Sequence, residues 1–430
     1  MVPSDFERWH YHAPRIRCLG GVCPRVVRSP CTYIDLEVIN AIKLEPSLRL
    51  PNLREISWAE WNDEMFFDIN PFLGPTVTHF NIISDGDCFF GVEPLEVLLS
   101  LSSHCPSIQQ VNIPHTVPAD LSGLIGRWHS LTHLQCVQSA FTAEGIAHLA
   151  CLPNLSRLTF RLEDGLDYKD ISTMQFPALE TLFVDASRLT LMSNFLDIVH
   201  SPHLRKIIIF LVDSPSLLTL QCFLAKVGAI CSNAIFEHFE IRDSHNHDLC
   251  VITPRDLEPL FSFKNLRHLS IDLHIVIAVD NAWLKTATST WPRLHHLQIE
   301  DRVFPQYNPD RKISPTGLLV LANLRELHFF MVRIDTRAMD WSSNPGVCST
   351  TVKTLRLDGS NIEDPLTDFR HLLDMFPRVN CVGVRGLGPV VRAEIEKMLR
   401  ENKRQRLVSS SSCRAIGKYV YHYCPEIQIT

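Results

Sequence analysis

The stretch "LPNLSRLTF" at residues 152–160 sets a Pro–Asn pair in front of a short apolar pattern. Leu155 and Leu158 are three positions apart, and Phe160 follows two positions later. Proline ends a preceding helix and restricts its neighbour to an extended conformation, so the chain should enter a strand here. Side chains alternate between the two faces of a strand, so Leu158 and Phe160 should share the buried face.

The same pattern recurs along the chain: an apolar residue, two others, a second apolar residue, one other, and a third apolar residue. Thirteen copies begin 23 to 32 residues apart. They are "LREISW" (53–58), "VTHFNI" (77–82), "IQQVNI" (108–113), "LTHLQC" (131–136), "LSRLTF" (155–160), "LETLFV" (179–184), "LRKIII" (204–209), "FEHFEI" (236–241), "LRHLSI" (266–271), "LHHLQI" (294–299), "LRELHF" (324–329), "VKTLRL" (352–357) and "VNCVGV" (379–384). "IRCL" (16–19) is interpreted as a frayed first copy.

Self-similarity at this period and spacing is typical of leucine-rich repeats. It predicts an α/β solenoid, or horseshoe, with parallel inner strands and helical outer returns. Returns are expected at 94–106, 142–153, 253–264 and 364–377, where leucines recur at helical spacing and Thr or Asp often comes first. The usual Asn or Cys three residues past each copy is absent, so the returns and the curvature should be irregular. The alternative is chance leucine pairs in an unrelated α/β protein.

Composition bounds the function. The net charge is −6 over 430 residues, which favours neither a nucleic-acid nor a membrane partner. No signal peptide and no membrane span is expected. The 14 cysteines contain no Cys-x-x-Cys pair, which favours reduced thiols in the cytoplasm or nucleus over a secreted disulfide framework.

The segment "DFERWHYHAPRIRCLGG" (5–21), the long irregular repeats and "CPEIQI" (424–429) resemble fungal F-box/leucine-rich-repeat proteins. The resemblance implies that the chain is the substrate-binding part of an F-box subunit of an SCF-type ubiquitin ligase. No Leu-Pro-led helical F-box is found, and residues 1–4 leave no room for one. A Skp adaptor and a cullin are therefore expected as partners only if an F-box lies upstream. The alternative is a stand-alone repeat scaffold that binds a protein without ubiquitin chemistry.

Three parts are expected: an N-terminal cap resembling the segment after an F-box (1–48), the repeats (49–388), and a C-terminal helix with a capping segment (389–430). Within the last part, 391–407 predicts a helix with a basic end. A solvated final helix is favoured there over a short nucleic-acid or nuclear-import patch.

Enzymatic chemistry is not expected. No Gly-rich phosphate loop, G-x-S-x-G or H-E-x-x-H motif is present. His245, His247, Asp248 and Cys250 lie close together, but no second ligand pair follows at zinc-finger spacing, so a solvated loop is favoured. No metal and no cofactor is predicted, and a hydrolase or metalloenzyme using the histidines is the disfavoured alternative.

The candidate site is the inner, concave face of the solenoid, where a protein substrate or partner should bind. Phe183, Ile208 and Phe210 place apolar groups on a face that should be polar, which indicates either an interface anchor or residues covered by a loop. A mixed-charge stripe beside them should orient the partner. Its residues are Glu240, Arg242, His268, Asp272, His296, Glu300, His328, Arg356 and Asp358.

Overall fold

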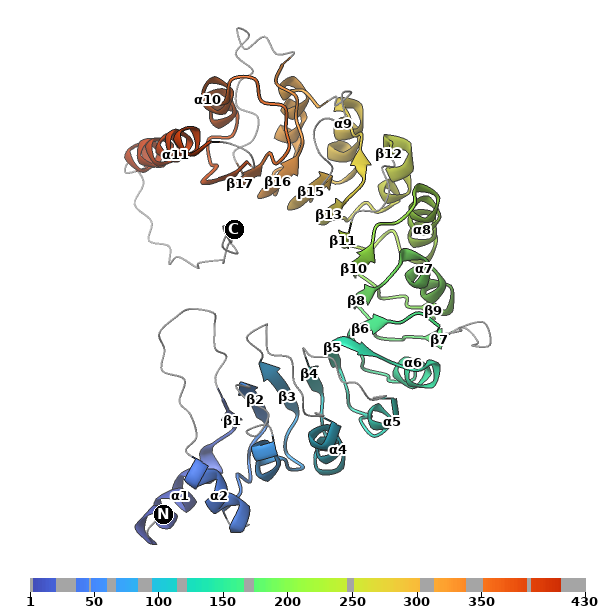
Figure 1. Cartoon of the computed structure of the whole chain (residues 1–430), viewed down its shortest axis with the longest axis vertical. Coiled ribbons are helices and arrows are strands. Elements are labelled where there is room, and N and C mark those ends of the chain that lie inside the picture. The colour runs from blue at the N-terminus through green and yellow to red at the C-terminus, as the bar shows by residue number, and fades with distance from the viewer. Residues whose placement is uncertain are drawn as a thin grey trace.

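The computed structural model describes residues 3–20, 36–45, 48–59, 67–83, 95–113, 122–165, 174–245, 251–301, 313–337, 351–384 and 388–410. Its main feature is one 14-stranded sheet in which sequence neighbours are also spatial neighbours and every pair is parallel. The sheet bends into an open arc with its strands on the inner side and its helices on the outer side (Figure 1). The predicted leucine-rich-repeat solenoid is confirmed.

Nearly every copy of the pattern forms a strand that begins at its third position. The strands of the main sheet are β1 (Cys18–Leu19), β2 (Glu55–Ala59), β3 (His79–Ile83), β4 (Gln110–Ile113), β5 (His133–Ala140), β6 (Arg157–Leu162), β8 (Thr181–Ala186), β10 (Lys206–Asp213), β11 (His238–His245), β13 (His268–Leu273), β15 (His296–Asp301), β16 (Phe329–Val332), β17 (Thr354–Arg356) and β18 (Cys381–Gly383). Two small parallel pairs join β7 (Met174–Gln175) to β9 (Val199–His200), and β12 (Val251–Ile252) to β14 (Val276–Ile277).

The outer layer mixes α-helices with 3-10 helices, as the missing Asn positions suggested. The α-helices are α1 (Pro3–His12), α2 (Leu36–Leu44), α4 (Leu95–His104), α5 (Ser122–Ile125), α6 (Ala143–Ala150), α7 (Leu189–Ile198), α8 (Leu217–Ile230), α9 (Asn281–Thr290), α10 (Pro365–Met375) and α11 (Pro389–Ser410). The 3-10 helices are η1 (Ala13–Arg15), η3 (Phe67–Phe72), η4 (Pro254–Ser262) and η6 (Pro315–Asn323). All four predicted returns are helical.

Local capping explains where these returns begin. The Thr142 hydroxyl accepts a hydrogen bond from the Gly145 backbone N–H (3.2 Å), and Asp364 does the same for α10. Each cap satisfies backbone donors that the first turn of a helix leaves without an intrahelical partner.

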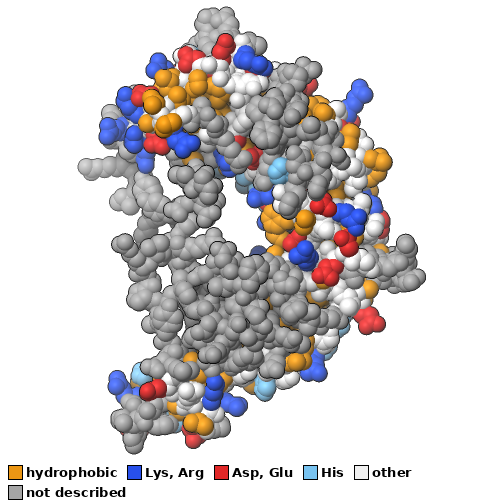
Figure 2. All heavy atoms as spheres, in the orientation of Figure 1, with side chains coloured by type: hydrophobic (Ala, Val, Ile, Leu, Met, Phe, Trp, Pro, Cys, Tyr) orange, Lys and Arg blue, Asp and Glu red, His pale blue; other side chains and the backbone are white. Residues whose placement is uncertain are grey.

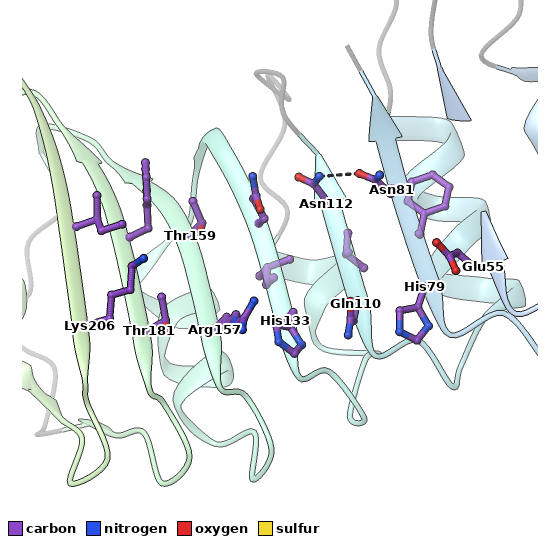
Figure 3. Close-up of a pocket in the computed structure, with 16 residues that line it drawn as sticks. Glu55, His79, Asn81, Gln110, Asn112, His133, Arg157, Thr159, Thr181 and Lys206 are labelled. Atoms are coloured by element: carbon purple, nitrogen blue, oxygen red, sulfur yellow. Dashed lines mark hydrogen bonds between the residues drawn. The ribbon is translucent and has the colours of Figure 1, made fainter. Parts of the chain in front are cut away.

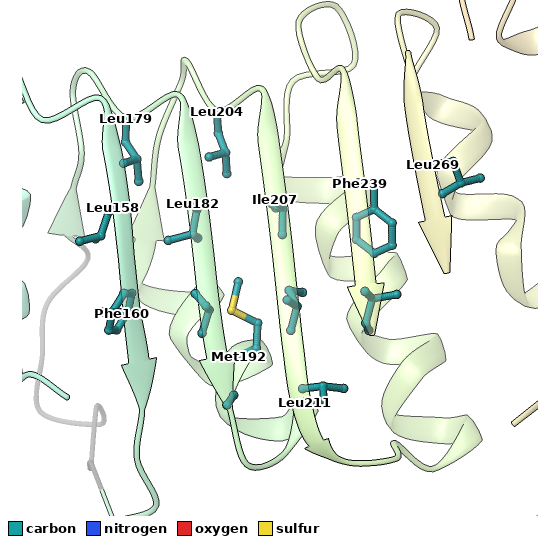
Figure 4. Close-up of a cluster of buried hydrophobic side chains, with 14 of the residues drawn as sticks. Leu158, Phe160, Leu179, Leu182, Met192, Leu204, Ile207, Leu211, Phe239 and Leu269 are labelled. Carbon is teal, nitrogen blue, oxygen red and sulfur yellow. The ribbon is translucent and has the colours of Figure 1, made fainter. Parts of the chain in front are cut away.

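The core lies between the strands and the outer layer. Leu155, Leu158 and Phe160 are all buried, and Phe160 packs edge-on against Phe195 of α7 at 5.3 Å between ring centroids. Leucines and isoleucines of successive strands stack beside one another along the arc (Figure 4). A repeat cannot bury its apolar face alone, so this continuous stack is what stabilises the fold.

The copy at 324–329 has a different register from the predicted one. Phe329 pairs with His296, so the apolar positions of the pattern that face the core are Leu327, just before β16, and Phe330 and Val332 within it. Leu324 caps the end of η6 and is buried there as well. Two overlapping apolar triplets therefore exist in the sequence, and the predicted register was wrong by three residues.

The chain ends extend the arc. The frayed copy at 16–19 forms β1, which pairs with β2, and the indole N–H of Trp9 in α1 donates to the Leu48 carbonyl (2.7 Å). The predicted C-terminal helix is α11, and it packs against α10. Among the described residues, none of the helices combines the length and hydropathy that a membrane-spanning segment requires.

Candidate functional site

The inner face is built from two rows of side chains, and the longer strands add a third position such as Phe210 and Arg242, because alternate residues of each strand point to the same side. The first row follows the strand starts: Glu55, His79, Gln110, His133, Arg157, Thr181, Lys206, His238, His268, His296, Phe329 and Thr354. The second row lies two residues further on: Ser57, Asn81, Asn112, Gln135, Thr159, Phe183, Ile208, Glu240, Ser270, Gln298, Met331 and Arg356.

The N-terminal half of this face forms a pocket of about 450 Å³, which we call the polar pocket. Its lining side chains project from β2 to β10 (Figure 3). They come mostly from the two rows and are amides, imidazoles, hydroxyls and a few charges. The lining residues are Glu55, His79, Phe80, Asn81, Gln110, Val111, Asn112, His133, Leu134, Gln135, Arg157, Thr159, Thr181, Phe183, Lys206 and Ile208.

Hydrogen bonds hold part of this lining. The Asn112 amide donates to Asn81 Oδ1 (2.6 Å), and the imidazoles of His79 and His133 each hydrogen-bond the hydroxyl of the preceding threonine at 2.8 Å. Burial lowers the pKa of His133, and the nearby Arg157 lowers it further. Amides and hydroxyls make up much of the polar lining, and Glu55, Arg157 and Lys206 add formal charges.

The predicted apolar anchor forms the C-terminal wall of the polar pocket. Phe183 and Ile208 line it, and Phe210 stacks edge-on against Phe183 at 5.0 Å between centroids. The Arg242 guanidinium lies 5.7 Å from the centre of the Phe210 ring. All three apolar side chains are half-buried. In the space-filling view, hydrophobic, basic and acidic side chains lie side by side along the inner edge of the arc (Figure 2).

Beyond the anchor, the first row becomes a stack of rings. His238 and His268 stack at 3.8 Å with planes 8° apart, His268 and His296 at 4.0 Å, and His296 and Phe329 at 4.1 Å. The in-register parallel pairing of β11, β13, β15 and β16 sets these contacts. Burial lowers the pKa of His238 to about 4 and that of His296 to about 3, so both are neutral at pH 7.

Glu240 sits beside this stack and is only 7% exposed. Its Oε1 lies 2.8 Å from the Arg242 guanidinium, and its Oε2 lies 3.4 Å from His238 Nε2 and 3.6 Å from His268 Nε2. Burial by itself would raise the pKa of Glu240, but these partners outweigh it and hold the pKa below its usual value. The carboxylate is therefore ionised at pH 7.

The rest of the predicted mixed-charge stripe is more buried than charges that contact a partner directly would be. Asp272, Glu300 and Asp358 are buried, and Asp358 pairs with Arg356 at 2.7 Å. His328 lies outside the two rows because of the register of β16: its backbone N–H donates to the His295 carbonyl just before the strand.

A second polar surface lies at the N-terminal ends of the strands, and the sequence analysis did not single it out. A pocket of about 380 Å³ there is lined by residues that include Arg205, Glu237, Arg267 and His295. His295 pairs with Glu326 at 2.6 Å, and Arg205 with Glu237 at 3.5 Å. The four lining residues directly precede first-row residues, so the repeat pattern could have indicated this surface. Which of its side chains form ion pairs depends on the strand register.

The end of β11 is held by a residue whose role the sequence did not reveal. Asp243 is buried within β11 and accepts hydrogen bonds from Ser214 (2.6 Å) and from both the backbone N–H (3.0 Å) and the imidazole (2.6 Å) of His274. His245 was expected in a solvated loop, but it is the last residue of β11 and pairs with Asp213 of β10. His247, Asp248 and Cys250 lie outside the described residues.

Comparison with known proteins adds a general likeness. No protein-family model and no curated protein sequence matches the chain. Among solved structures, an internalin from Listeria monocytogenes is 14% identical, with 80% of this chain and 93% of that chain covered and a TM-score of 0.39. The plant peptide hormone receptor RGFR1 in complex with RGF2 is 13% identical, with 78% and 64% covered and a TM-score of 0.25.

Proposed function

We propose that this chain is a non-enzymatic recognition module that binds an extended segment of a partner protein along its inner face. The observation that carries the proposal is the junction of the polar pocket with the exposed edges of Phe183, Ile208 and Phe210. Amides and imidazoles can satisfy backbone groups of a bound segment, and an apolar anchor beside them supplies most of the binding free energy.

Binding of a partner can be tested with two variants of similar chemistry. Phe183→Ala combined with Phe210→Ala removes the anchor on the inner face. Leu218→Ala is the matched control, because Leu218 is 69% exposed on α8 of the outer layer. Partners captured by crosslinking and identified by mass spectrometry should be lost from the double variant and retained by Leu218→Ala. Equal capture by both variants would contradict the proposal.

A finer proposal is that the partner is a substrate of an SCF-type ubiquitin ligase, with the chain acting in the cytoplasm or nucleus. Its support is the resemblance of residues 5–21 to the segment that follows an F-box. The test is to express the chain extended by the upstream reading frame and to ask whether the Skp adaptor co-purifies with it.

The second candidate is a stand-alone repeat scaffold with the same inner face. It is favoured if stop codons interrupt the upstream frame or if the extended chain retains no Skp adaptor. Both candidates predict the same partner-capture results for the anchor variants. Partner capture therefore tests binding on the inner face, and co-purification of the Skp adaptor separately tests the ubiquitin-ligase role.

A further inference from the structure

Three potential metal ligands converge on the inner face where the sequence separates them by up to 30 residues. His238 and Glu240 are two positions apart on β11, so their side chains leave the same face of the strand. His268 is the register partner of His238 on the neighbouring β13. Backbone pairing therefore brings two imidazoles and one carboxylate to one spot.

The spacing of the three ligand atoms suits a small tetrahedral ion. The distances from Glu240 Oε2 to the Nε2 atoms of His238 and His268 are 3.4 and 3.6 Å, and all three ligand atoms lie within 4.8 Å of one another. Zinc bonds of about 2.0–2.1 Å place the corners of a tetrahedron about 3.4 Å apart. An ion could thus reach all three atoms once the two stacked imidazole rings tilt apart.

The chemical state of the ligands also fits. His268 Nε2 is buried, and Glu240 Oε2 lies 3.6 Å from it, just beyond hydrogen-bond distance, so the described structure leaves this nitrogen without a full hydrogen bond. His238 offers an imidazole nitrogen and Glu240 a carboxylate oxygen, and both are donor types that zinc accepts. Arg242 engages the other carboxylate oxygen and so directs Oε2 toward the imidazoles.

We propose that His238, Glu240 and His268 bind one divalent transition-metal ion, with Zn²⁺ as the preferred physiological candidate. Two imidazoles and one carboxylate form a ligand set that zinc sites use while keeping a fourth position open. All three side chains belong to the concave face, so water or a partner side chain bound to that face can complete the coordination. The expectation from sequence that the chain holds no metal is replaced by this proposal.

Two features oppose tight binding and set the expected affinity. The rings of His238 and His268 are nearly parallel, and an ion must lie close to the plane of each imidazole, so the rings must tilt apart. The cations Arg242 and Lys206 also lie close enough to interact with Glu240, and they repel a dication. We therefore expect a dissociation constant in the micromolar range, not the much tighter binding of a structural zinc site.

Calorimetric titration of the full chain tests the proposal. The protein is purified without a polyhistidine tag, stripped with a chelator, and titrated with Zn²⁺ and, as a hard-ion comparison, with Mg²⁺. The wild type should bind one Zn²⁺ saturably and show no comparable Mg²⁺ binding. Glu240→Gln and His268→Phe should each weaken Zn²⁺ binding at least tenfold.

His296→Phe is the matched control. It removes the next imidazole of the same stack but leaves all three proposed ligands in place, so its zinc affinity should stay within about twofold of wild type. Bound Co²⁺ should give the intense visible absorption of a four-coordinate site in wild type and His296→Phe, and not in His268→Phe.

Thermal unfolding without metal shows which variants are folded. The proposal is overturned if the wild type has no saturable zinc site, or if the folded Glu240→Gln or His268→Phe variant binds zinc as tightly as wild type. The latter result would place the ion on other histidines or on the cysteines.

Discussion

The inner face has two parts built on the same backbone and filled in different ways. From β3 to β8, Asn81, Asn112 and Thr159 line an open pocket. From β11 to β15, the equivalent positions Glu240, Ser270 and Gln298 are buried. Both parts pair in parallel and keep the two rows in register, because the register shift between β5 and β6 comes only after Gln135. The pairing of the two rows therefore does not cause the difference.

The difference lies in the size and stacking of the first-row side chains. Gln110 separates His79 from His133 in the pocket region, and among the residues that the structure describes there, the imidazoles do not stack. In the second region His238, His268 and His296 are adjacent and stack, which encloses the carboxylate of Glu240 beside them. A repeat scaffold can thus carry an open site and a closed polar cluster side by side without any change of fold.

The largest effect should come from the core, which both regions share. Phe160→Ala in β6 and Phe239→Ala in β11 each delete a fully buried ring and should each lower the free energy of unfolding by about 3–5 kcal/mol. Urea unfolding followed by circular dichroism measures this loss. A small loss in only one region would show that the two regions do not depend on one core.

Removing a buried carboxylate that accepts several hydrogen bonds should lower the free energy of unfolding more than removing one partner of an exposed ion pair. Asp243→Ala removes the carboxylate that accepts hydrogen bonds from Ser214 and His274. It should lower the free energy of unfolding by about 2–3 kcal/mol. Asp164 is the control in the pocket region: its pair with Arg188 is exposed, so Asp164→Ala should change stability little. Similar urea midpoints for the two variants would contradict the difference in burial.

The closed region should also respond to pH. His238 and His296 have folded pKa values of about 4 and 3, below the unfolded value near 6.5. The unfolded chain therefore takes up these protons first, and stability falls as the pH drops from 7 to 5. Each histidine should contribute about 2 kcal/mol to this fall.

The pH effect can be isolated by substitution. His296→Phe keeps a ring in the stack and should reduce the difference in unfolding free energy between pH 7 and pH 5. An unchanged difference in His296→Phe would mean that the stacked imidazoles do not stay neutral.

The smallest effect is expected at the anchor. Phe183→Ala removes a half-buried ring and should cost only about 1 kcal/mol in the same urea assay, because much of its apolar surface is already in water. A loss as large as that of Phe160→Ala would identify Phe183 as a core residue and remove it from the binding surface.

The sequence by itself determined the solenoid, the order of the strands and most of the core. Leu158, Leu182 and Leu269 could be assigned to the buried face because spacing within a strand is a local property of the chain. The repeat also placed Phe183, Ile208 and Phe210 on the inner face from spacing alone.

Only the tertiary structure decided the register of β16, the burial of Asp272 and Glu300, and the meeting of His238, Glu240 and His268. Leu324 and Leu327 both suit the apolar pattern, so the choice between registers depends on pairing with β15. Burial and clustering on the inner face depend on which side chains neighbouring strands bring together. Those neighbours lie about 30 residues apart in sequence, and no local pattern encodes their contacts.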